Sequence, residues 1–189
     1  SFGEQKHWPN ISFSKNLKNK IKNRLKFIKN KYNLSKIYVG FTYAFDQKNS
    51  DSILNINRLS GVYKKNNKKK IGIVFVVFSK LNCSSDFIIG INKRIKINEM
   101  FLKDYIDFFY KDSSDLSIPY TLYVASSIKT PFITSRDSFF SKDIINFKIG
   151  GLANTKRELL NIIFNYDFNY SINFLKKNSW EKSANKLFN

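Results

Sequence analysis

The residue types that most often carry catalysis or bind metals are scarce in this chain of 189 residues. It has one cysteine, Cys83, and one histidine, His7. Two such residues cannot build a Cys/His zinc site or a disulfide framework, and this usage fits a reducing compartment. Cys83 follows an apolar run and is expected to pack as a small hydrophobic residue. Since the histidine lies in an N-terminal arm, a catalytic thiol with an imidazole partner is not predicted.

Paired carboxylates and glycine-rich loops are the other arrangements that could support an enzyme. Asp104 and Asp107 have the i, i+3 spacing of one helix face, and Asp112 and Asp115 follow shortly after. Without histidines or metal ligands nearby, this acidic region is interpreted as a solvated helix face or as a contact for a neighbouring basic protein. The seven glycines are scattered and lack the spacing of a phosphate-binding loop. We therefore predict no enzyme activity, no cofactor and no metal site.

Charge is the most unusual property of the composition. The 33 Lys and Arg residues against 14 Asp and Glu give a net charge of +19. Such a charge repels itself unless an anionic partner such as nucleic acid neutralises it. However, Lys, Asn, Ile, Phe and Tyr make up more than half of the chain, which is typical of AT-rich genomes, so codon bias explains part of the lysine excess.

The longest apolar run, Ile71–Phe78, is far shorter than the roughly 20 residues of a membrane-spanning helix, and no membrane span is predicted.

Residues 1–85 are predicted to form a basic N-terminal α/β extension. Residues 1–10 are expected to be an arm. From Leu17 to Tyr32, apolar residues recur every three or four positions among many lysines, which indicates an amphipathic basic helix. The other predicted elements are strands at Ile37–Phe45 and Ile71–Phe78, a polar turn at 46–52 and a charged loop at 64–70.

Residues 86–177 are predicted to form one regular domain, followed by a tail at 178–189. The expected elements are strands at 87–97, 118–128, 139–149 and 170–175, helices at 98–111 and from about 154, and a polar hairpin tip at 129–138. This order, β-α-β-β-α-β, is typical of a ferredoxin-like sandwich, an α+β fold with two helices on one face of an antiparallel sheet. Its two central strands would form an extended β-hairpin.

The hairpin at 118–149 resembles that of the S-ten family, the tenth protein of the small ribosomal subunit. The family has Leu-Pro, then Ser-Pro-His-Val, then Ser-Arg-Glu-Gln-Phe-Glu. This chain has Ile118-Pro119, then Lys-Thr-Pro-Phe-Ile at 129–133, then Ser-Arg-Asp-Ser-Phe-Phe at 135–140. The resemblance covers residues 86–177. The family's histidine is Phe132 here, so the contact made by that imidazole is not carried over.

The resemblance implies a structural constituent of the ribosomal small-subunit head. The implied partners are small-subunit rRNA and neighbouring head proteins of the third, ninth and fourteenth families. The long extension and the composition favour the mitochondrion over a plastid. Basic and hydroxyl side chains on the hairpin and first strand would contact phosphate oxygens. The predicted RNA-binding residues are Lys93, Arg94, Lys96, Lys129, Thr130, Ser135, Arg136, Lys142 and Lys148.

Two other functions stay open at the level of the sequence. The chain could be an accessory interaction subunit of an organellar membrane complex, with its basic helix on lipid. It could also be a free RNA-binding module, which would need exposed aromatic side chains on its sheet.

Overall fold

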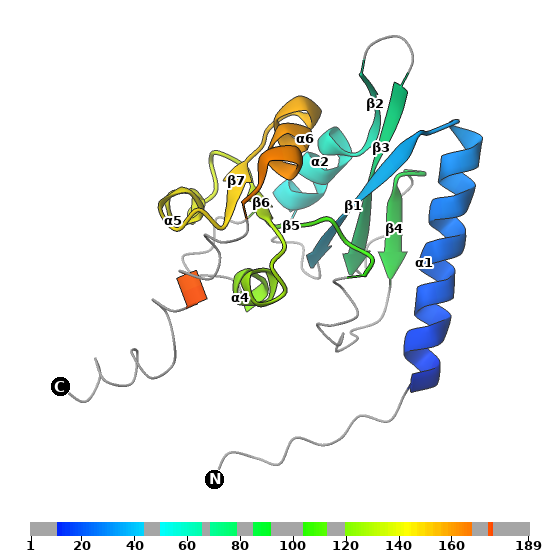
Figure 1. Ribbon diagram of the computed structural model, residues 1–189, viewed down its shortest axis with the longest axis horizontal. Coiled ribbons are helices and arrows are strands. Elements are labelled where there is room, and N and C mark those ends of the chain that lie inside the picture. The colour runs from blue at the N-terminus through cyan, green and yellow to red at the C-terminus, as the bar shows by residue number, and fades with distance from the viewer. Residues whose placement is uncertain are drawn as a thin grey trace, which may run out of the picture.

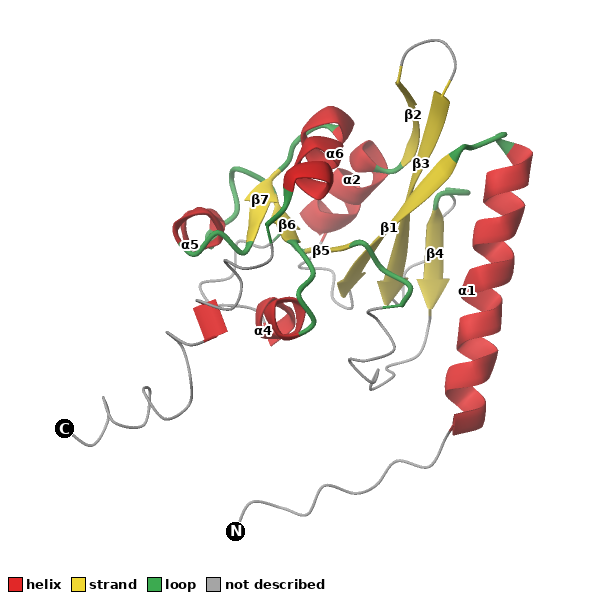
Figure 2. Cartoon of the chain, in the orientation of Figure 1, coloured by secondary structure: helices red, strands yellow, loops and turns green. Residues whose placement is uncertain are grey.

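The computed structural model describes residues 11–43, 50–65, 69–78, 85–91, 104–112, 120–167 and 174–175. These residues form a seven-stranded sheet with helices on both faces (Figures 1 and 2). The strands are β1 (Lys36–Tyr43), β2 (Gly61–Lys65), β3 (Lys69–Phe78), β4 (Ile88–Ile91), β5 (Phe108–Tyr110), β6 (Phe132–Thr134) and β7 (Gly150–Leu152). The helices are α1 (Ile11–Lys31), α2 (Ser50–Leu59), α4 (Tyr120–Ser127), α5 (Ser141–Asn146) and α6 (Lys156–Asn165).

The sheet is mostly parallel. Its parallel strands lie side by side in the order β4-β3-β1-β5-β6-β7. The short strand β2 runs antiparallel along the first half of β3, on the edge whose second half pairs with β4. Numbered along the chain, the parallel strands have the order 3-2-1-4-5-6, which is that of the doubly wound, Rossmann-type α/β fold.

The prediction of an α+β ferredoxin-like sandwich is therefore wrong. Residues 120–127 and 141–146, predicted as strands of one hairpin, form α4 and α5, and residues 108–110, predicted as helix, form β5. Helix α4 is buried on most of its surface, with Leu122, Val124 and Ala125 all in one apolar layer, so its sequence shows no clear helical periodicity. This burial outweighs the strand preference of a segment rich in aromatic and β-branched residues.

Other predicted elements are confirmed. The basic helix is α1, the two N-terminal strands are β1 and β3, and the last predicted helix is α6. The helix α2 and the strand β2 were not predicted. One sheet includes strands from both sides of the boundary predicted at 85/86, since β1 pairs with both β3 and β5. The arm at 1–10 and the tail at 178–189 lie outside the described residues.

Two apolar layers enclose the sheet. Helices α2 and α6 cover one face, where Ile56 and Leu159 pack against alternate residues of the strands. Helices α1, α4 and α5 cover the other face and bury residues such as Ile21 and Ile144. Because both faces are covered, β1 and β3 carry nearly continuous apolar runs. Figure 1 shows the helices arranged on the two sides of the sheet.

Gly40 allows β1 and β5 to lie side by side. A Cβ atom at this position would lie 2.4 Å from the ring of Phe108, its partner on β5. The aromatic ring therefore occupies the space that any other residue at position 40 would need. This close packing brings the carboxyl ends of the two strands together.

Candidate ligand site at the carboxyl edge of the sheet

The order of the strands reverses between β1 and β5. The chain proceeds from β1 outward through β3 to β4 and then returns to β5 on the other side of β1. In doubly wound sheets, this reversal leaves a crevice at the carboxyl ends of the two central strands, and ligands bind there. The polar side chains that follow or end β1, β5 and β6 lie at this edge.

Asp112 lies two residues after β5 and accepts hydrogen bonds from three side chains. Its Oδ1 accepts from Oγ of Ser135, directly after β6, at 2.7 Å. Its Oδ2 accepts from Nδ2 of Asn55 on α2 and, at 3.3 Å, from the hydroxyl of Tyr110 on β5. Only 8% of Asp112 is exposed, so these donors replace water around the carboxylate. They also hold it in one orientation.

Tyr110 and Arg58 extend this network in opposite directions. Burial, with the nearby charge of Asp112, raises the pKa of the Tyr110 phenol, so the hydroxyl stays protonated and donates its hydrogen bond. On the solvent side, Nη2 of the exposed Arg58 donates to Oδ1 of Asn55 at 2.7 Å. The network therefore runs from an exposed guanidinium through an amide to a buried carboxylate.

Thr42 places a hydroxyl beside the same network. It is the second-last residue of β1 and only 1% exposed. Residues Gly40 and Phe41 pair with Phe108 and Phe109, so this register puts Thr42 next to Tyr110, on the sheet face covered by α2 and α6. Within the described part of the chain, its hydroxyl has no hydrogen-bond partner.

An ion pair next to Ser135 links the end of β6 to the first turn of α6. Nη2 of Arg136 contacts Oε1 of Glu158 at 2.8 Å, and the backbone N–H of Arg136 donates to Oδ1 of Asn154 at 3.2 Å. The hydrogen bond from Arg136 is the main cause that lowers the pKa of Glu158 to about 2. Glu158 also completes a capping box with Thr155 at the start of α6. This arrangement positions Arg136 at the rim of the edge that carries Asp112.

The six predicted RNA-binding residues that the structure describes are not brought together on one surface. Thr130 and Ser135 are buried, and Ser135 bonds Asp112. The exposed Lys129 and Lys148 follow α4 and α5 and precede β6 and β7, so they lie at the amino edge of the sheet, opposite Arg136. Lys142 is exposed on α5. The remaining three predicted residues, Lys93, Arg94 and Lys96, lie outside the described residues.

The sequence pointed to Ser135 and Arg136 but not to the role of Asp112. Asp112 was interpreted only as part of an acidic segment. The signal that could have identified it is its place directly after Phe-Phe-Tyr, a short apolar run of the kind that forms a buried parallel strand.

Metal binding and membrane insertion require other arrangements of residues. Over the described ranges, no group of three or more His, Cys, Asp or Glu side chains is placed to hold a metal ion. None of the described helices combines the length and apolar character needed to cross a bilayer.

No family model and no curated protein matches the chain. Among solved structures, it is similar to a UDP-GlcNAc 2-epimerase from Methanocaldococcus jannaschii in complex with UDP-GlcNAc and UDP. The identity is 17%, the match covers 82% of this chain and 46% of that chain, and the TM-score is 0.45. It is also similar to the N-terminal domain of trehalose-6-phosphate phosphatase from Candida albicans, with 12% identity, coverage of 83% and 40%, and a TM-score of 0.44. The chain spans less than half the length of either structure.

Proposed function

We propose that this chain binds a nucleotide at the carboxyl edge of its sheet, between β1 and β5. The observation that carries the proposal is the position of Asp112, a buried and oriented carboxylate two residues after β5. In doubly wound folds, ligands bind at the carboxyl ends of the strands where the strand order reverses. An ionised carboxylate at this edge can accept hydrogen bonds from ribose hydroxyls. Asp112 provides such a carboxylate, and it lies where the strand order reverses.

Arg58 supplies positive charge for a phosphate group, whereas the charge of Arg136 is compensated by Glu158. Arg58 contacts Asn55, which contacts Asp112, and Arg136 is the neighbour of Ser135. Both guanidinium groups are exposed, and a planar guanidinium can bind two phosphate oxygens at once. Among the described residues, Arg58 forms no ion pair with an acidic side chain. A ligand with hydroxyls near Asp112 and a phosphate near Arg58 therefore matches the polarity of this edge.

The sequence after β1 favours a mononucleotide over a dinucleotide. A dinucleotide-binding fold carries three glycines in the first turn between strand and helix, where they allow the backbone to approach the pyrophosphate. Residues 44–60 of this chain contain no glycine. The proposal concerns binding and assigns no reaction.

Calorimetric titration of the full chain with the four common ribonucleoside monophosphates tests the proposal. Asp112→Asn should weaken binding by roughly ten-fold or more, because a hydrogen bond to a charged group contributes about 1.5–3 kcal/mol. Asp104→Asn is the matched control, since Asp104 is exposed and precedes β5 at the amino edge. Its affinity should equal that of the unchanged protein.

A second variant keeps the test informative if the loss of Asp112 disturbs folding. Arg58→Gln changes an exposed side chain and should weaken binding of the nucleotide more than binding of the nucleoside. The proposal is wrong if no nucleotide binds, or if Asp104→Asn weakens binding as much as Asp112→Asn does.

The ribosomal role, the mitochondrial location and the rRNA and protein partners stay predictions. The hairpin that suggested them is not formed, since residues 120–149 contain α4, β6 and α5. Cosedimentation with small-subunit rRNA at high salt would support them, and migration as a free protein would count against them.

A further inference from the structure

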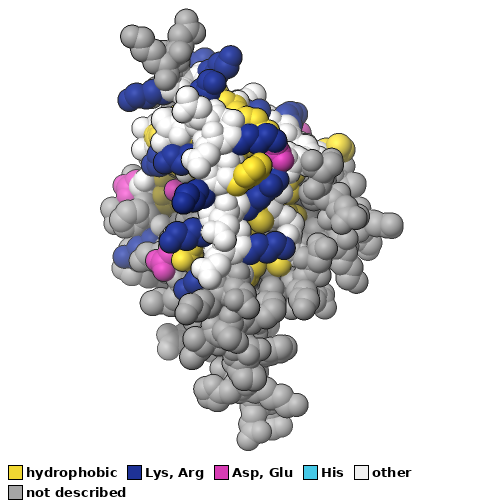
Figure 3. Space-filling model, turned by 90° about the vertical axis from the view of Figure 1, so that its right-hand side faces the viewer, with side chains coloured by type: hydrophobic (Ala, Val, Ile, Leu, Met, Phe, Trp, Pro, Cys, Tyr) yellow, Lys and Arg dark blue, Asp and Glu magenta, His cyan; other side chains and the backbone are white. Residues whose placement is uncertain are grey.

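We propose that α1 and the groove beside it dock this domain onto a membrane surface that contains anionic phospholipids. The surface lies on α1 and β4, away from Asp112, so the proposal is independent of nucleotide binding. Figure 3 shows this side of the molecule, where Lys and Arg side chains follow the helix and apolar side chains lie between them.

The charge of α1 has one sign. Its 21 residues include eight Lys and Arg and no Asp or Glu. The side chains of Lys20, Lys22, Lys26 and Lys29 are exposed, and none of them pairs with an acidic side chain in the described part of the chain. Lys22, Lys26 and Lys29 lie on one flank of the helix and Lys20 on the other flank, beside the groove, and uncompensated lysines on an exposed helix attract the phosphates of an anionic leaflet.

Packing and one carboxylate hold α1 in place. Leu17, Ile21 and Ile28 are buried against the sheet, so the apolar stripe of the helix is not available for insertion into lipid. Asp86, just before β4, contacts Arg24 at 2.9 Å and also accepts hydrogen bonds from Lys31 and, at 2.7 Å, from the hydroxyl of Tyr32. The helix therefore presents a fixed cationic face to the membrane.

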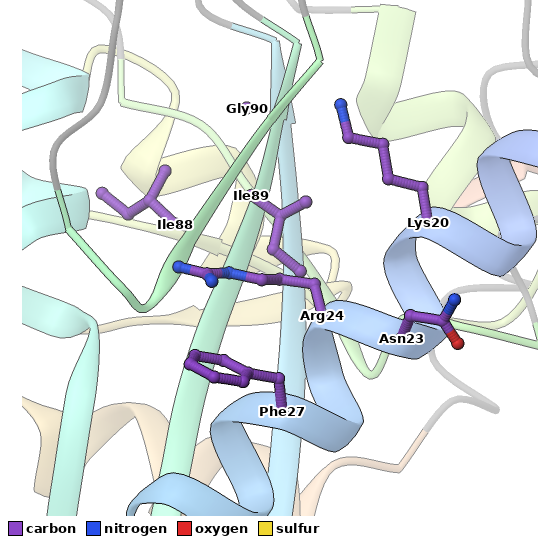
Figure 4. A pocket seen from close by; sticks show the side chains of 7 residues that line it. All are labelled: Lys20, Asn23, Arg24, Phe27, Ile88, Ile89 and Gly90. Carbon is purple, nitrogen blue, oxygen red and sulfur yellow. The ribbon is translucent and has the colours of Figure 1, made fainter.

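The groove between α1 and β4 adds an apolar component to this face. It has a volume of about 470 Å³. Its lining residues are Lys20, Asn23, Arg24, Phe27, Ile88, Ile89 and Gly90. Phe27 is 48% exposed and extends with Arg24 from α1 toward β4 (Figure 4). Cations on the rim and apolar groups on the floor match the headgroup phosphate and the first acyl carbons of a phospholipid.

The ring of Phe27 favours lipid over RNA as the partner. Single-stranded RNA uses the open face of an aromatic ring for base stacking. Here the Arg24 guanidinium lies over the Phe27 ring at 5.0 Å from its centroid, and the Lys31 ammonium at 5.7 Å. A base would have to displace these cations, whereas an acyl chain needs only the apolar edge of the ring.

Vesicle sedimentation of the full chain tests the proposal. We expect binding to vesicles of phosphatidylcholine mixed with phosphatidylserine, weak binding to phosphatidylcholine alone, and loss of binding as salt is raised. Lys20→Glu with Lys26→Glu should lower the partition coefficient by roughly twenty-fold or more, since each basic residue near an anionic leaflet contributes roughly five-fold. The matched control, Lys142→Glu with Arg157→Glu, makes the same change of charge at exposed residues of α5 and α6 and should have little effect.

A second pair of variants isolates the apolar contribution. Phe27→Ser should weaken binding several-fold, while Phe139→Ser, which changes a ring that is 53% exposed elsewhere, should not. Circular dichroism checks that each variant is folded. The proposal is overturned if anionic vesicles do not bind, or if both charge-reversed pairs lose binding equally, which would indicate unspecific attraction. Binding to single-stranded RNA without binding to vesicles would also overturn it and would identify an RNA surface.

Discussion

Ser135 donates a hydrogen bond of 2.7 Å to Oδ1 of Asp112, and these two residues follow the neighbouring strands β6 and β5. They are 23 positions apart in the chain. The bond therefore links the carboxyl ends of two neighbouring parallel strands. It also orients the carboxylate on which nucleotide binding is proposed to depend.

The Ser135 hydrogen bond should contribute measurably to stability. Ser135→Ala should lower the free energy of unfolding by about 1–3 kcal/mol, because it removes a donor from a buried carboxylate. In the control Ser127→Ala, the lost hydroxyl bonds only a nearby carbonyl on the exposed end of α4, and a change within about 0.5 kcal/mol is expected. Urea unfolding of both variants measures the difference, and equal losses would contradict this role of Ser135.

Gly40 should tolerate no side chain. Gly40→Ala places a Cβ 2.4 Å from the Phe108 ring and should destabilise the fold by about 1–3 kcal/mol through overpacking. Gly90→Ala is the control, because a Cβ on that residue of β4 would meet no atom within 4 Å. Thermal unfolding should show a lower melting temperature for the first variant only. Similar melting temperatures for both variants would mean that β1 and β5 can separate at no cost.

Asp107 should destabilise the fold when it is ionised. Its Oδ2 accepts a hydrogen bond from the N–H of Val39 at 2.7 Å, but burial raises the pKa of its carboxyl above the ordinary 3.8. Since the folded state holds this proton more tightly, the cost of ionisation appears as pH rises through the folded pKa. Asp107→Asn keeps an oxygen for Val39 and removes the charge, so at pH 7 it should be as stable as the unchanged protein or more stable. Asp107→Ala loses the acceptor and should cost about 1 kcal/mol in urea unfolding.

Asp86 should contribute stability that is lost in acid. Hydrogen bonds from Lys31 and then Tyr32 lower the pKa of Asp86 to about 2, from an ordinary value of 3.8. The unfolded chain therefore binds the proton first, and the contribution is complete above pH 3.8 and lost as pH falls toward about 2. Asp86→Asn should have a lower melting temperature than the unchanged protein at pH 6, and the two curves should converge near pH 2. A difference that persists at pH 2 would assign the stability to packing instead of charge.

Some elements could be predicted because their signals are local. The helix α1 carries apolar residues at helical spacing, α6 begins with the capping box of Thr155 and Glu158, and β1 and β3 are long apolar runs. Each of these signals lies within a few residues of the element that it predicts. The prediction failed at α4, where aromatic and β-branched residues favour a strand and burial on most sides of the helix leaves no helical periodicity in the sequence.

The candidate site was only partly visible in the sequence. Ser135 and Arg136 stood out as polar residues in a short segment, but they were assigned to RNA because that segment was predicted to be a hairpin tip. In the structure, Ser135 is buried and bonds Asp112, and Arg136 pairs with Glu158. The partners of both residues are distant in the chain, so no local pattern could have identified them.

The sequence by itself determined the basic character of the chain, the amphipathic helix α1, the buried strands β1 and β3, and the scarcity of cysteine and histidine. Composition and periodicity suffice for these features because they depend on neighbours in the chain. Only the tertiary structure decided that β1 lies between β3 and β5, and that Asn55, Tyr110 and Ser135 meet at Asp112. Strand pairing joins residues as far apart as Gly40 and Phe108, and it is selected by packing of the whole core.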